Sequence, residues 1–134
     1  MIRSDDGTAL LLTLGYAVLA IALILVCADA TSLYLARKRV DAAADAAALA
    51  GAYGFTIEVV DGRPVARVTD GAVREQAADV VEVHERMELV AAGSPDGMSA
   101  RVTVRTTWHA PILTLFVPGG VRIESTATSR TAIG

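Results

Sequence analysis

The residues from Ala9 to Ala28 read ALLLTLGYAVLAIALILVCA, a run without a single charged side chain. At about 1.5 Å of rise per residue, a helix of this length spans roughly 30 Å, which is the thickness of the hydrocarbon core of a bilayer. A helix buried in a small soluble domain does not need to be apolar on every side over such a length. The run therefore predicts a transmembrane helix.

Two kinds of processing are alternatives to a retained anchor. One is signal-peptidase cleavage after Ala30, and the other is a lipoprotein signal ending at Cys27. A signal peptide has a basic n-region and an apolar core of about 7–15 residues, whereas this core is longer and its flank carries one arginine against two aspartates. The bulky Val26 stands where a lipoprotein signal has a small residue. We therefore expect the segment to be retained.

The helix is expected to continue beyond the membrane. No glycine or proline occurs between Ala28 and Gly51, and alanine, the strongest helix former, dominates this part of the chain. Glycines at 51 and 54 are suitable stop signals. We predict one helix from about Gly7 to Ala52, roughly 70 Å long at 1.5 Å per residue.

A row of small residues runs along the second half of this helix at a spacing of four: Ala43, Ala47 and Gly51. Such rows allow another helix or a sheet to approach closely. Two interpretations stay open: the row packs against the C-terminal sheet of the same chain, or it receives a helix of a partner protein.

The rest of the chain predicts a small domain of strands and one short helix. Asp61-Gly62, between two apolar runs, is a strong hairpin signal. A helix from about Gly71 to Glu85, capped by Asp70, is expected to follow. Its predicted inner face consists of Val73, Ala77, Val80, Val81 and His84.

Three further strands are expected, and they are residues 87–92, 100–108 and 121–130, the last with Val121 turned inward. The middle one alternates apolar and polar residues, as a half-buried antiparallel strand does. The predicted fold class is α+β: a long N-terminal transmembrane helix that continues outside the membrane and packs on a small, mostly antiparallel sheet with one short helix, in a pilin-like architecture. The expected organisation is a flank (1–8), a transmembrane segment (9–28), an extramembrane helix (29–54) and a domain (55–134).

Composition argues against several kinds of activity. The net charge of −3 gives no basic field for nucleic acid. His84 and His109 are the only histidines, and neither stands in a metal-binding spacing such as HExxH. No glycine-rich phosphate loop and no nucleophile elbow occurs. We expect no catalytic site, no metal, no cofactor and no small-molecule substrate.

Two features suggest contacts with a membrane or a partner. Asp29 lies at the expected membrane edge, where an ionisable group is costly unless it is solvated or paired. Both a solvated and a partner-binding role are open for it. The segment from Pro111 to Pro118 is strongly apolar, and it either tucks under the sheet or touches the membrane or a neighbouring subunit. The candidate contact residues in this segment are Ile112, Leu113, Leu115 and Phe116.

Three consecutive stretches carry a resemblance to a known family. They are the apolar run ending at Ala28-Asp29, LYLARKR at 33–39 and DAAADAAALAGA at 41–52. This segment resembles the N-terminal region of the TadE/TadG-like proteins of Flp (tight-adherence) pilus assembly. The remainder is similar to the shorter, actinobacterial TadG-related type only in length and α+β pattern.

The resemblance implies a minor pilin-like or pseudopilin-like component with its N-terminus in the cytoplasm and its domain outside the cell membrane. Membrane lipid and other pilus or secretion subunits are then the expected partners. The basic residues Arg37–Arg39 favour the opposite orientation by the positive-inside rule. Pseudopilins are cleaved after a glycine and usually carry a glutamate five residues later, whereas Leu12 stands at that distance from Gly7. We expect the N-terminus to be retained.

Two functional hypotheses follow. The first is a membrane-anchored, non-catalytic component of a Flp/Tad-type pilus assembly or secretion machine. The alternative is a membrane-tethered extracytoplasmic sensor or ligand-binding domain.

Overall fold

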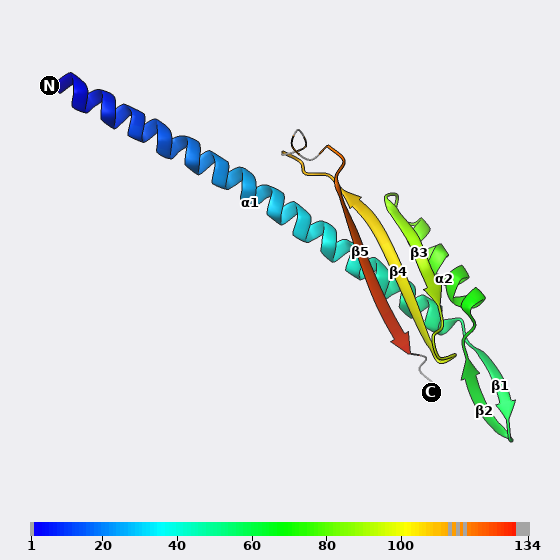
Figure 1. Cartoon of the computed structure of the whole chain (residues 1–134). Coiled ribbons are helices and arrows are strands. Elements are labelled where there is room, and N and C mark those ends of the chain that lie inside the picture. Colours follow the sequence, from blue (N-terminus) through cyan, green and yellow to red (C-terminus); the bar gives the residue numbers. More distant parts are fainter. Residues whose placement is uncertain (1, 113, 115, 117, 131–134) are drawn as a thin grey trace.

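The computed structural model describes residues 2–112, 114, 116 and 118–130. It contains two helices and two antiparallel sheets, so the predicted α+β class is confirmed (Figure 1). The elements in chain order are α1 (Ile2–Tyr53), β1 (Thr56–Val60), β2 (Arg63–Arg67), α2 (Asp70–Glu82), β3 (Met87–Gly93), β4 (Ser99–Trp108) and β5 (Val121–Arg130).

The helix α1 is continuous over 52 residues, which corresponds to about 78 Å at 1.5 Å per residue. The predicted continuation past the apolar run is confirmed, and the helix starts earlier than expected, at Ile2. Its N-terminal half projects free of the domain, while its C-terminal half lies along the sheet (Figure 1). The most apolar 18-residue window has a mean hydropathy of 2.8 and is entirely unburied, so α1 is a candidate membrane span by length and composition.

The domain has two layers. Strands β3, β4 and β5 form one antiparallel sheet in that order, with an irregularity in β3 between Leu89 and Ala91. Helix α1 packs against β4 and β5, α2 packs against β3, and the two helices contact each other. Both helices cover the same face of the sheet, and the other face is left to solvent, as is common for antiparallel sheets.

Small side chains dominate the contact between α1 and the sheet. Two alanine rows are buried there, Ala43 with Ala47 and Ala44 with Ala48. They belong to the same core as Val102, one of the inward-facing residues of β4. Of the two interpretations of the small-residue row, the structure shows the first: the row packs inside its own chain. Alanine permits this because it brings the helix backbone close to the strands.

The first hairpin stands apart from the main sheet. Asp61 and Gly62 both have positive φ, 53° and 78°, as a type I′ turn requires, so the predicted turn is confirmed. Within the described part of the chain, strands β1 and β2 pair only with each other, and they project beyond the C-terminal end of α1 (Figure 1). The side chains of Ile57 and Val59 are exposed on this hairpin.

The predicted cap of α2 was wrong by one residue. The hydroxyl of Thr69 accepts a hydrogen bond from the backbone N–H of Ala72 at 3.3 Å, so Thr69 is the cap. Asp70 is the first helical residue, and its carboxylate instead accepts from the N–H of Ser94 at 2.7 Å. The helix also ends at Glu82, before His84.

Two predicted inward-facing positions were also wrong. His84 is exposed, because it lies beyond the end of α2 and is no longer turned toward the core. Val121, at the start of β5, is exposed as well, because it pairs with Trp108 at the end of the sheet, where the core stops.

Candidate functional site

Asp29 is a buried carboxylate on α1, one residue past the end of the apolar run. Its side chain is 5% exposed, and its Oδ1 accepts a hydrogen bond from the backbone N–H of Ile112 at 3.2 Å. Its Oδ2 is buried without a hydrogen-bond partner among the described residues. Asp29 is therefore neither simply solvated nor turned outward toward a partner: it fastens the segment between β4 and β5 to the helix.

A second hydrogen bond lies about one helical turn further along α1. The indole N–H of Trp108, the last residue of β4, donates to the hydroxyl of Ser32 at 3.1 Å. Together with the bond from Ile112, it holds the end of β4 beside the helix just past the apolar run. The connection between β4 and β5 therefore lies at the end of the domain nearest to the N-terminal half of α1 (Figure 1).

This connection carries the apolar candidate residues. Ile112 is 40% exposed and Phe116 is 80% exposed, so neither side chain is buried under the sheet. Ala110, at the start of the connection, is buried and anchors it. The candidates Leu113 and Leu115 lie outside the described residues.

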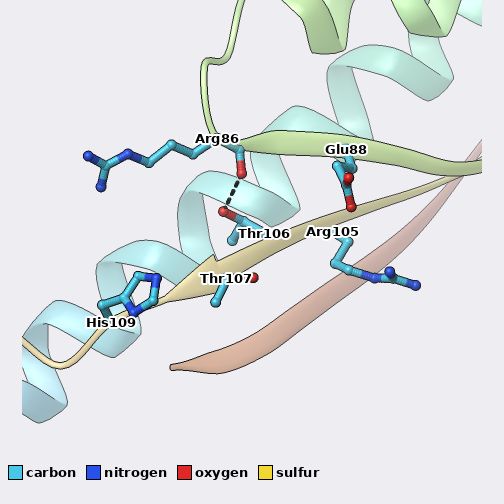
Figure 2. Close-up of a pocket in the computed structure, with 6 residues that line it drawn as sticks. All are labelled: Arg86, Glu88, Arg105, Thr106, Thr107 and His109. Atoms are coloured by element: carbon cyan, nitrogen blue, oxygen red, sulfur yellow. Dashed lines mark hydrogen bonds between the residues drawn. The ribbon is translucent and has the colours of Figure 1, made fainter. Parts of the chain in front are cut away.

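A groove with basic side chains adjoins the connection. One part, of about 430 Å³, is lined by Arg86, Glu88, Arg105, Thr106, Thr107 and His109 (Figure 2). A neighbouring part of about 260 Å³ shares Arg86 and His109 and reaches Arg39 and Ser32 on α1. The two hollows meet along the end of β4, and we call them together the basic groove.

The cations of the basic groove differ in how they are paired. Arg105 forms an ion pair with Glu124 at 2.8 Å. Within the described part of the chain, neither Arg39 nor Arg86 forms an ion pair. The backbone at Arg86 is fixed, because its carbonyl accepts a hydrogen bond from the Thr106 hydroxyl at 2.7 Å (Figure 2). The groove thus offers two guanidinium groups that no carboxylate pairs with among the described residues, and a guanidinium can bind phosphate or carboxylate through two hydrogen bonds.

The predicted contact residues fall into two groups. Asp29 and Ile112 are joined by a hydrogen bond beside the apolar run, and Phe116 lies on the same β4–β5 connection as Ile112. Ala43, Ala47 and Gly51 lie in the core between α1 and the sheet, where they contact residues of their own chain. Reasoning from the sequence missed the basic groove, because its arginines come from separate segments of the chain: α1, the turn before β3, and β4.

The outward side of the same half of α1 keeps large side chains exposed. Leu35, Leu49 and Tyr53 are each about half exposed or more. Their spacing of 14 and 4 residues places them on one side of the helix. This side is opposite to the buried alanines and is not used by the domain.

Among the described residues, no group of three or more His, Cys, Asp or Glu side chains is close enough together to hold a metal ion.

Comparison with known families concerns the long helix. Residues 7–54 match the family described as "Putative Flp pilus-assembly TadE/G-like". Over this helix, the chain is similar to TadE/G-like proteins. No curated protein and no solved structure matches the chain. The TadE/G-like segment coincides with α1 and includes both the apolar run and the alanine rows, and the family description points to a pilus-related role.

Proposed function

We propose that the chain is a non-catalytic, membrane-anchored component of a Flp/Tad-type pilus assembly or secretion machine, with a minor pilin-like or pseudopilin-like role. The observation that carries the proposal is the coincidence of the TadE/G-like match with one unbroken helix that is unburied in its first half and forms part of the core in its second.

The two halves of α1 differ in their surroundings, and this difference supports an anchored subunit. The first half exposes apolar side chains on every side, and a bilayer would cover all of them. The second half buries alanines against β4 and β5, so the domain is fixed to the anchor without a linker. A force applied to the domain would therefore be transmitted directly to the membrane anchor. A component that holds or starts a filament needs such a rigid connection.

The outward side of α1 is the surface proposed for partner subunits. The buried alanines cannot receive a partner helix while the domain is packed as observed. Leu35, Leu49 and Tyr53 remain available on the opposite side, and a helix from another subunit can pack lengthwise against them.

Photo-crosslinking in cells that carry the pilus machine tests the proposal. A photoreactive residue at Leu49 is expected to give adducts with pilus or secretion subunits. The matched control is Glu75, which is exposed on α2 away from this side and is expected to give none of these adducts. Adducts of Leu49 with lipid alone, or the same adducts from both positions, would contradict the proposed role.

A further inference from the structure

The membrane-side end of the domain combines apolar and basic groups in an ordered way along α1. The connection between β4 and β5 is bonded to Asp29, directly after the apolar run, and presents Ile112 and Phe116 to the surroundings. Next along the helix come Ser32 and Trp108, and then the basic groove with Arg86. Apolar groups thus lie nearest to the predicted hydrocarbon and cations lie farther from it.

Distances along the helix place the connection and Trp108 at headgroup height, whereas the basic groove lies farther out. Ser32 is four residues past Ala28, or about 6 Å along the axis. The headgroup layer is roughly 5–8 Å thick on each side of a 30 Å hydrocarbon core. The indole of Trp108, which is bonded to Ser32, therefore lies at headgroup height, where tryptophan is commonly enriched. Arg39 is eleven residues past Ala28, or about 16 Å along the axis, so the groove meets headgroup phosphates when α1 tilts toward it.

We propose that this end of the domain docks on the bilayer that holds α1: Ile112 and Phe116 enter the interface, and the basic groove binds phosphates of anionic lipid headgroups. The inference rests on the proposed membrane anchor and is independent of which way α1 is oriented. It gives the domain a second membrane contact and fixes its tilt.

Charge and shape favour a lipid headgroup in this groove. Arg39 and Arg86 present guanidinium groups that no carboxylate of the described residues neutralises, and His109 and Thr107 add polar groups beside them. Glu88 is a carboxylate in the lining, and it lies at the end where Arg105 is already paired. An exposed phenylalanine on the connection that adjoins these cations suits a lipid, which offers an apolar chain below its phosphate, better than it suits a free phosphate ion.

Asp29 acts as a positioning residue for this contact. Asp29 itself does not bind the phosphate, because its carboxylate and the phosphate are both negatively charged and repel each other. Its bond to the N–H of Ile112 sets the height of the connection relative to the apolar run. Its buried Oδ2 accepts no bond within the described residues, so the bond from Ile112 is the only one that holds this carboxylate to the connection.

Fluorescence of the full chain in lipid nanodiscs tests the docking. The chain has one tryptophan, so Trp108→Phe with Phe116→Trp places a single indole at the proposed insertion point. Its emission is expected to shift to shorter wavelength and to be quenched by lipids brominated on their acyl chains. The matched control is Trp108→Phe with Val59→Trp, which places the indole on the exposed hairpin at the far end of the domain. This control is expected to respond only to a water-soluble quencher.

The charge component is tested by changing the lipid and the groove separately. Discs containing phosphatidylglycerol should raise quenching of the indole at position 116 above the level in phosphatidylcholine discs. Arg86→Gln and Arg39→Gln should each lower the ratio of docked to undocked chains roughly fivefold, from the usual contribution of one cation near an anionic surface. Arg63→Gln, on the distant hairpin, removes the same charge and should have no effect.

The outcomes separate the docking from the anchor. Chains that enter the discs but keep a water-exposed indole at position 116 would overturn the docking alone. Insertion of the indole at position 116 that does not depend on phosphatidylglycerol or on the two arginines would overturn the headgroup site. A change in its fluorescence with inorganic phosphate as large as that with the lipid would also overturn it. Failure of the wild-type chain to enter discs at all would contradict the proposed anchor as well.

Discussion

Gly51 is the position at which a single added methyl group is expected to matter. A Cβ built on it would lie 2.9 Å from Cγ1 of Val73 and 3.1 Å from Cβ of Ala100. The β-branched valine on α2 cannot rotate freely to relieve this contact. The small residue therefore sets how closely α1, α2 and β4 approach.

We expect Gly51→Ala to lower the free energy of unfolding by about 1 kcal/mol, because overpacking of about 1–3 kcal/mol exceeds the gain of roughly 1 kcal/mol in helix propensity. Thermal unfolding of the detergent-solubilised chain, followed by Trp108 fluorescence, measures the change. Gly71→Ala, in open space at the start of α2, is the matched control and should stabilise the protein by about 0.4–1 kcal/mol. Equal effects at both glycines would argue against the close approach.

Asp96 organises the turn between β3 and β4. Its Oδ1 accepts hydrogen bonds from the N–H of Met98 at 2.9 Å, and from the N–H and the hydroxyl of Ser99, each at 2.8 Å. The bond from Met98 is the largest cause that holds the pKa of Asp96 below its ordinary value of 3.8, followed by the Ser99 hydroxyl. The ionised carboxylate is therefore favoured in the folded state.

Because the folded-state pKa of Asp96 is lowered, its contribution to stability is complete above the unfolded-state pKa and is lost as pH falls through the folded-state value. Asp96→Asn should therefore lower the melting temperature near neutral pH, and the difference from wild type should shrink below about pH 4. Ser99→Ala removes one of the donors and should show part of the same loss. A difference that stays constant from pH 7 to pH 2 would disagree with this origin.

At the scale of single residues, only some of the observed turns, caps and hydrogen bonds could be predicted from the sequence. The Asp61-Gly62 turn could be predicted, because positive φ at two positions needs these residue types. The cap of α2 could be placed only to within one residue, since Thr69 and Asp70 are both good caps. The bond between Asp29 and Ile112 could not be predicted, because it depends on how far β4 extends along α1.

The element that organises the molecule is α1, and its two sides differ although both are rich in alanine. Ala47 is fully buried against the chain's own core, whereas the adjacent Ala46 is exposed. The spacing of four predicted the small-residue row, but it did not predict what packs against the row. In the structure the chain's own sheet and α2 pack against it, because both need a cover and α1 is the only other helix among the described residues.

Paired substitutions test which side of α1 belongs to the core. Ala47→Leu should lower the free energy of unfolding by about 1–3 kcal/mol or more, because the added atoms have no space between α1 and the sheet. Ala46→Leu should change it by less than about 0.5 kcal/mol. Chemical unfolding in detergent measures both. A well-tolerated leucine at position 47 would indicate that the domain does not pack on α1 as described.

At the scale of the whole molecule, the strand pattern predicted the α+β class, but the sheet divides into two parts. The hairpin β1–β2 forms its own sheet because it follows α1 at the far end of the helix, beyond the reach of β3 to β5 (Figure 1). Alternation along a strand predicts which residues share a face, but it does not predict which strands meet.

The basic residues Arg37–Arg39 present a conflict at this scale. The positive-inside rule favours a cytoplasmic domain, whereas the proposed pilus role needs the domain outside. Arg39 belongs to the basic groove in the structure. A contact with anionic headgroups on the outer side of the membrane would give Arg39 a role that does not depend on the usual orientation signal.

The central proposal is that one helix anchors the chain in the membrane and holds its domain outside the cytoplasm. Cysteine labelling in intact cells tests it most directly, in a Cys27→Ser background that leaves no other thiol. A membrane-impermeant maleimide should label Ala46→Cys, which is exposed beside the domain, and should not label Leu14→Cys, which lies in the apolar run. Labelling of position 46 only after the cells are opened would contradict the orientation, and labelling of position 14 in intact cells would contradict the anchor.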